Sequence, residues 1–201
     1  MREPSAQRAV RSAQVTAGLR TAHCVLRTVL IALVLLAATC KKKPPVTTNL
    51  AAQNQVAPRV VRLYFESAAM LLVSEQRNVQ VPQNSAGALP AVVRELTKGA
   101  TNPAFARVLP ADTVIRGAYL LPDGTAFIDL GGTTLTQGWS AGSHEELMAI
   151  YSIVETVMAN FAEVKKVRVL VNGMPAETLA GHIALDKPLT PMPSLLDPRA
   201  R

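Results

Sequence analysis

The alternation of apolar and polar positions predicts several β-strands along the chain. Residues 59–65, RVVRLYF, are rich in β-branched and aromatic side chains and indicate a strand. Residues 70–81, MLLVSEQRNVQV, indicate one or two further short strands around a polar turn. Two apolar segments, 113–121 and 125–130, flank the sequence Pro122-Asp123-Gly124, whose proline and glycine suit a tight turn, so we expect a β-hairpin there.

Apolar residues at helical spacing predict a short helix between these strands. The helix ends before Gly99, a residue type that commonly terminates helices, and it has one buried stripe. The stripe consists of Leu89, Val92, Val93 and Leu96.

A second and longer helix is predicted from about His144 to Asn160. Ser143 and Glu146 have the S-x-x-E spacing of a capping box, in which each side chain bonds an otherwise unpaired backbone N–H. One face of the helix is apolar, and we expect the residues of that face to point into the core. They are Leu147, Ile150, Tyr151, Val154, Met158 and Phe161.

The order of the elements predicts an α+β fold. A final strand is expected at residues 166–171, KVRVLV, with Asn172-Gly173 turning out of it. The series of strands, helix, hairpin, helix and strand fits a small mixed or antiparallel sheet of about five strands with two helices packed on one face.

The N-terminal residues have the pattern of a targeting segment. An arginine-bearing start leads into the apolar run 29–38, VLIALVLLAA, which is shorter than the roughly 20 residues needed to span a bilayer. Residues 1–39 therefore indicate a signal peptide. The sequence LLAATC, which ends at Cys40, resembles the lipobox of bacterial lipoproteins and predicts lipidation of Cys40; ordinary secretion and an uncleaved anchor are the alternatives.

Composition divides the rest of the chain into three parts. Residues 40–58 contain the lipid-anchor cysteine and have the Pro/Thr/Asn/Gln composition of a flexible linker. Residues 59–189 form the expected domain, and residues 190–201 are proline-rich and predicted to be a disordered tail. Between Arg59 and Lys187 the chain has 11 basic and 12 acidic residues, so we expect no nucleic-acid partner.

The sequence GWSAG at residues 138–142 matches the G-x-S-x-G turn that exposes a nucleophilic serine in α/β-hydrolases. That turn requires a strand running directly into the serine, but the nearest predicted strand ends at Leu130, ten residues before Ser140. Downstream, His182 precedes Asp186, which reverses the hydrolase order of acid before base. We therefore expect Ser140 not to be catalytic, and an envelope serine hydrolase using Ser140 is the alternative.

The same region offers two candidate contacts for a partner, Trp139 and His144. Trp139 is the only tryptophan and stands in a loop without apolar periodicity; it either folds back onto the domain or contacts a partner. His144 belongs to HEELM, where Met148 replaces the second histidine of a zinc-binding H-E-x-x-H motif. We expect neither a metal nor a cofactor, and the aspartates 112, 123 and 129 have no calcium-loop spacing.

The ordered series of segments resembles the GerMN domain family, which is named for sporulation and spore germination proteins. The resemblance covers about residues 59–189. It rests on RVVRLYF, the helix before Gly99, LPADTVIRGAYLLPDGTAFIDLG, GSHEELMAIYSIVETV, VKKVRVLVNG and TLAGHIALDKP. Its clearest positions are Asp129, Leu130, Gly142, Glu146, Thr156, Val167, Val171, Gly173, Gly181 and His182.

The resemblance implies a module of the bacterial cell envelope that lies outside the cytoplasm and does no chemistry. It also implies similarity to the ring-building domains of secretion and sporulation assemblies. The expected partners are the membrane, through the lipid anchor, and another copy, an envelope protein or a cell-wall glycan.

Lipidation of Cys40 has a direct test. The variant Cys40→Ser removes the thiol to which a lipid would be attached, so it should leave the membrane fraction or accumulate as an unprocessed precursor. Membrane fractionation and gel mobility measure both effects. An unchanged distribution together with unchanged mobility would contradict lipidation.

Overall fold

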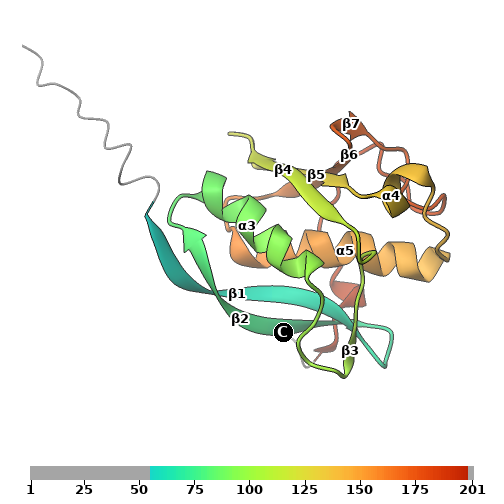
Figure 1. Cartoon of the computed structure of the whole chain (residues 1–201), viewed down its shortest axis with the longest axis horizontal. Coiled ribbons are helices and arrows are strands. Elements are labelled where there is room, and N and C mark those ends of the chain that lie inside the picture. The colour runs from blue at the N-terminus through green and yellow to red at the C-terminus, as the bar shows by residue number, and fades with distance from the viewer. Residues whose placement is uncertain (1–54, 199–201) are drawn as a thin grey trace, which may run out of the picture. The chain divides into compact units, whose positions relative to one another are not determined.

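The computed structural model describes residues 55–198, which form an α+β domain with two sheets (Figure 1). The three-stranded sheet has the order β2-β1-β3 and contains β1 (Val56–Ser67), β2 (Leu72–Pro82) and β3 (Phe105–Ala106). The four-stranded sheet has the order β4-β5-β6-β7 and contains β4 (Val114–Leu120), β5 (Thr125–Gly131), β6 (Lys166–Val171) and β7 (Met174–Pro175). The helices are α3 (Ser85–Thr97), α4 (Thr133–Gln137), α5 (Ser143–Asn160) and the short 3₁₀ helix η1 (Pro193–Leu195).

The α+β prediction is confirmed, but the strands lie in two sheets where the pattern indicates one. β1 and β2 pair along their whole length, from Val56 opposite Pro82 to Glu66 opposite Leu72. The polar sequence within β2 is therefore not the turn that was predicted within residues 70–81. It belongs to one continuous strand, whose turn comes earlier, where Met70 has a positive φ of 57°.

Polar side chains of β2 attach the C-terminal end of α3 to the sheet. Arg77 lies with its guanidinium 5.4 Å from the ring centroid of Phe65 and contacts Glu75 at 2.6 Å and Glu95 at 3.2 Å. Its side chain is only 10% exposed. These buried charges are paired, which offsets the cost of taking them out of water.

The predicted hairpin is confirmed as β4 and β5, and β6 is the predicted final strand. β6 pairs parallel to β5, with Ile128 opposite Val169. Parallel neighbours require a crossover connection, and α4 and α5 supply it. The loop that we expected at residues 131–142 thus contains the short helix α4.

Helix α5 lies between the two sheets (Figure 1). Its middle part is buried around the whole circumference. Ile150 and Val154 are fully buried as predicted, while Leu147 is half-buried at the helix start. Every residue from 148 to 157 is buried. The prediction of a single buried face was therefore too narrow, because α5 packs against β1 on one side and β6 on another.

The capping box predicted for Ser143 and Glu146 is not formed, and one side-chain-to-backbone bond at the start of α5 takes its place. Gly142 is the N-cap, and its N–H donates to Oε2 of Glu145 at 2.9 Å. Ser143 is the first helical residue. Glu146, one position further on, points into the domain and is 0% exposed.

The buried carboxylate of Glu146 accepts four backbone N–H groups from residues 179–183. Leu179 and Ala180 donate to Oε1 at 2.7 and 2.8 Å, and His182 and Ile183 donate to Oε2 at 2.7 and 3.1 Å. The loop between these donors contains Gly181 at a φ of +95°, a conformation that glycine adopts without steric cost. Glu146 thereby fixes a loop that has no helix or strand bonds of its own.

The C-terminal residues up to 198 pack on the domain, which contradicts the prediction of a disordered tail from residue 190. Leu189 pairs with Val167 of β6, and Leu196 bridges to Leu72 of β2. Between them the N–H of Met192 donates to Oε1 of Glu155 at 2.8 Å. The prolines of this segment limit its regular structure to the short helix η1, but its apolar side chains still gain from burial.

The predictions for residues 1–54, including Cys40, and for residues 199–201 lie outside the described residues. Within residues 55–198, no helix combines the length and the apolar character that crossing a membrane requires.

Replacing Glu146 tests the role of its carboxylate. In Glu146→Gln an NH₂ group replaces one carboxylate oxygen. This NH₂ group cannot accept the two backbone N–H groups that donate to that oxygen in the parent protein. Since each buried polar group left unpaired costs about 1–3 kcal/mol, we expect a loss of at least about 2 kcal/mol in urea unfolding. The neighbouring Glu145→Gln, on an exposed residue, should change stability by about 0.5 kcal/mol or less. Equal effects of the two variants would contradict the role of Glu146.

Burial raises the pKa of Glu155 above its ordinary value, and the smaller effect of the Met192 N–H opposes the shift. A raised pKa in the folded state means that stability is lost as the pH rises through that pKa. Glu155→Gln keeps an oxygen acceptor for Met192 without a charge. It should unfold at higher urea concentration than the parent at about pH 7, and the difference should vanish at about pH 4 or below. A variant less stable than the parent at about pH 7 would contradict this account.

Candidate functional site

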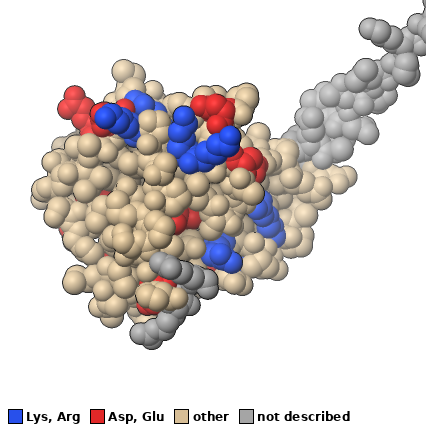
Figure 2. All heavy atoms as spheres, turned by 180° about the vertical axis from the view of Figure 1, so that it is seen from behind, with Lys and Arg blue, Asp and Glu red and all other residues tan. Residues whose placement is uncertain are grey.

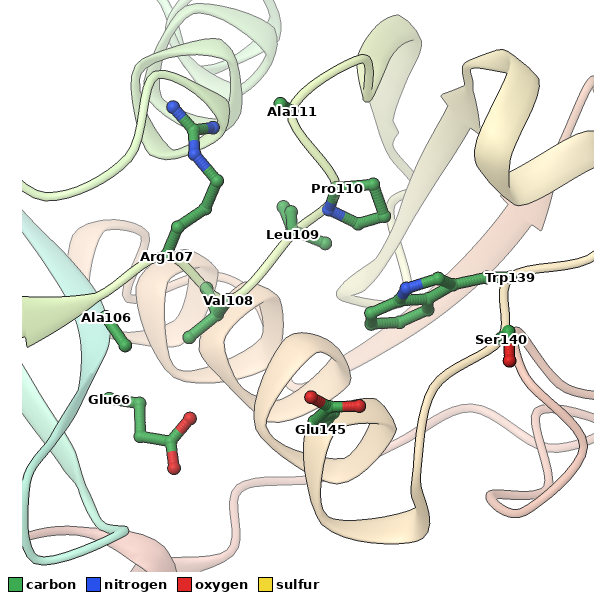
Figure 3. A pocket seen from close by; sticks show the side chains of 10 residues that line it. All are labelled: Glu66, Ala106, Arg107, Val108, Leu109, Pro110, Ala111, Trp139, Ser140 and Glu145. Atoms are coloured by element: carbon green, nitrogen blue, oxygen red, sulfur yellow. The ribbon is translucent and has the colours of Figure 1, made fainter.

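A hollow of about 350 Å³ lies at the N-terminal end of α5 (Figure 3). Its walls come from the end of β1, from β3 and the segment that follows it, from the loop before α5 and from the first turn of α5. The lining residues are Glu66, Ala106, Arg107, Val108, Leu109, Pro110, Ala111, Trp139, Ser140 and Glu145. This volume is at the lower end of the range of about 300–1,000 Å³ typical of ligand pockets.

Trp139 forms an aromatic wall of the hollow. Its indole is half-buried, packs against the hydrophobic core and lies beside Pro110 (Figure 3). The expectation that the ring folds back onto the domain therefore describes its position. Because the ring also lines the hollow, its role as a partner contact stays a prediction.

Two carboxylates, Glu66 and Glu145, lie on the opposite side of the hollow from Pro110 (Figure 3). Nε2 of His144 and Oε1 of Glu66 are 2.7 Å apart, and Oε2 of Glu145 accepts the N–H of Gly142. Each carboxylate thus has one oxygen held by the protein. His144 itself does not line the hollow; it positions Glu66.

The guanidinium of Arg107 is turned away from these carboxylates (Figure 3). It donates from Nη1 to the carbonyl of Thr97 at 2.6 Å and from Nη2 to the carbonyl of Lys98 at 2.7 Å, at the end of α3. Only the stem of Arg107 borders the hollow, so the side chains that face into it carry negative charge and apolar surface.

A second hollow of about 380 Å³ continues from the first and shares Glu66 and Ala106 with it. It runs between the β1–β2 turn and the segment before β3. Met70, at its edge, is 62% exposed. The two hollows therefore adjoin at the β1–β3 pairing, where Glu66 lies opposite Ala106.

Ser140 lacks the surroundings of a hydrolase nucleophile. It is exposed, its hydroxyl points away from the indole (Figure 3), and α4 separates it from the end of β5. Nε2 of His182 lies 3.0 Å from the carbonyl of Ala141, and Nε2 of His144 is engaged by Glu66. The structure thus places two histidines near the loop without joining the Nε2 atom of either to Ser140.

The aspartates considered for calcium binding have structural partners. Oδ2 of Asp112 accepts the N–H of Thr134 at 2.8 Å, and Oδ1 of Asp129 accepts the N–H of Gly173 at 2.7 Å. In the part of the chain that the structure describes, no three His, Cys, Asp or Glu residues are grouped as a metal site would require.

Sequence reasoning identified Trp139 but missed the two carboxylates and the segment 107–111. The buried pair Val108-Leu109 is an apolar signal in a stretch without regular structure, and it could have marked a segment packed on the core. Nothing in the sequence connects Glu66 with Glu145, because they meet only through the pairing of β1 with β3 and the position of α5.

Surface charge is mixed elsewhere. On the face seen in Figure 2, lysine and arginine side chains lie beside aspartate and glutamate side chains and do not form a continuous basic stripe. This distribution gives no support to a phosphate-backbone footprint.

The chain matches a known family. The model of the family described as "Germane: Sporulation and spore germination" matches residues 62–177, more than half of the chain. No functionally curated protein matches the sequence.

Solved structures that are similar to this chain include proteins from two bacteria. The tandem GerMN domains of the sporulation protein GerM from Bacillus subtilis share 20% identity at a TM-score of 0.55, covering 67% of this chain and 46% of that one. The first GerMN domain of the same protein shares 19% identity with this chain at a TM-score of 0.47. The match covers 70% of this chain and 98% of that one. A candidate lipoprotein from Clostridium perfringens shares 18% identity with this chain at a TM-score of 0.48. The match covers 71% of this chain and 93% of that one. This chain thus corresponds to less than half of the tandem structure.

Proposed function

Since the chain belongs to the Germane family of sporulation and spore germination (GerMN) domains, we propose that it is a non-catalytic, envelope-tethered interaction module whose partner docks in the Trp139 hollow. The solved GerMN structures support the fold on which this proposal builds. The partner is another envelope protein, a second copy or a cell-wall glycan.

The half-buried indole of Trp139 is the observation that carries the proposal. Tryptophan is enriched among residues that dominate binding energy, and such residues lie in pockets that exclude water. An indole already packed against the core is held in place before binding, so less conformational entropy is lost when a partner arrives.

Tethering through Cys40 completes the proposal. A lipidated cysteine followed by about 18 linker residues would hold the domain roughly 25 Å from a membrane surface. Such a distance lets a small domain contact other envelope components while it stays concentrated near the membrane.

The hydrolase alternative has no support in the geometry around Ser140. A nucleophile requires a general base within hydrogen-bond reach and a group that orients the base. The Nε2 atoms of both nearby histidines are instead taken by a carbonyl and by Glu66.

Site-specific photocrosslinking in the native envelope tests where the partner docks. A photoreactive side chain at Ala111, which lines the hollow, should capture a partner. The same probe at Val60, which is 62% exposed near the opposite end of α5, should not. Trp139→Ala should abolish the crosslink from Ala111, whereas Ser140→Ala should retain it.

Two results would contradict this proposal. One is equal capture from Ala111 and Val60. The other is labelling by a fluorophosphonate probe, or turnover of a short-chain ester, that disappears in Ser140→Ala. Urea unfolding of Trp139→Ala shows whether loss of the crosslink reflects an unfolded domain.

A further inference from the structure

The charge of the hollow limits the chemistry of its ligand. Two carboxylates, Glu66 and Glu145, border it, and the one guanidinium among its lining residues is bound elsewhere, to carbonyls at the end of α3. Oε2 of Glu66 and Oε1 of Glu145 have no hydrogen-bond partner among the described residues. The hollow thus presents acceptors with negative charge to whatever enters it.

The indole adds a second preference for positive charge. The face of a tryptophan ring attracts cations, and this attraction is strongest where water is partly excluded. A partly buried charge such as that of Glu66 is also screened less than a charge on an open surface, whereas Glu145 is exposed. The side chain of Glu66 is 18% exposed, so it lies within the wall and not on the rim.

The shape of the hollow fits one long side chain with chain on both sides. Its volume of about 350 Å³ is small for a ligand pocket, and the second hollow of about 380 Å³ beyond Glu66 and Ala106 leaves room for flanking residues. The second hollow includes the apolar residues Met70 and Phe105.

From these features we infer that the hollow binds a basic side chain, arginine in preference to lysine, on an extended segment of a partner protein. This inference rests on the proposed function and names the chemistry of the docked partner. A guanidinium has a planar face that can stack on the indole of Trp139 while its in-plane N–H groups donate to carboxylates such as those of Glu66 and Glu145; the ammonium of lysine has donors but no planar face to stack. A neutral glycan could also stack on the indole and donate hydroxyl groups to the carboxylates, but it would leave their negative charge uncompensated.

Tryptophan fluorescence of the protein tests the inference directly, because Trp139 is the only tryptophan among the 201 residues. Titration with the peptide acetyl-Ala-Arg-Ala-amide should change the emission to saturation. The same peptide with citrulline, which keeps the shape of arginine without its charge, should bind about tenfold more weakly or worse, as expected for loss of a close charge pair.

Variants separate charge from shape. The double variant Glu66→Gln with Glu145→Gln should bind the arginine and citrulline peptides equally. Glu163→Gln, an exposed glutamate beyond the other end of α5, should keep the preference for arginine. Quenching of Trp139 by caesium relative to iodide should fall by about twofold or more in Glu66→Gln/Glu145→Gln. The reason is that this variant lacks the negative potential that concentrates the cation in the hollow.

The outcomes distinguish this inference from the proposed function. Equal binding of the arginine and citrulline peptides by the parent protein overturns the inference. Saturation by chitotriose without saturation by the arginine peptide also overturns it and makes the ligand a glycan. In both cases a crosslink from Ala111 that depends on Trp139 leaves the docking proposal standing.

Discussion

One buried charge, the carboxylate of Glu146, joins helix α5 to the loop at residues 179–183. The carboxylate of Glu146 lies in the first half of α5 without solvent exposure and receives the N–H groups of four residues between Leu179 and Ile183. An uncompensated carboxylate in this place would cost several kcal/mol, so helix and loop depend on each other. Through this contact the last part of the chain is fixed to the helix that separates the two sheets. The loop that contains Trp139 leads into the same helix about one turn before Glu146. The Trp139 wall of the hollow is therefore attached to a helix that Glu146 holds in place.

Local patterns predict the elements whose stability is local. The hairpin of β4 and β5 follows from Pro122 and Gly124, and α3 follows from its apolar stripe. The division into two sheets could not be predicted, because it depends on which strands pair across long stretches of sequence. The same reason explains the capping error at α5. A glutamate at 145 and one at 146 look alike in sequence, and only tertiary packing decides which is buried.

The candidate site shows the same limit. Trp139 stands out as a large aromatic residue among glycine, serine and threonine, so the sequence alone marks it. Glu66 looks like any strand-end glutamate, and Glu145 like any first-turn acid that suits a helix N-terminus. Their shared role arises because β3 places Ala106 and the segment after it beside both. Composition likewise predicts a disordered tail at residues 190–201, although apolar side chains up to Leu196 pack against the hydrophobic core.

The polar sequence of β2 has a consequence for solubility. β2 is an edge strand, and edge strands expose backbone groups on which a strand of another molecule can assemble into aggregates. At its start, Leu72 is covered by Leu196, and the N–H of Asp197 donates to the carbonyl of Leu72 at 2.9 Å. Along its middle, the exposed polar residues Gln76, Asn78 and Gln80 present side chains that an intruding strand would have to desolvate. The residues that made β2 look interrupted in sequence are those that keep this edge from extending the sheet into a second molecule.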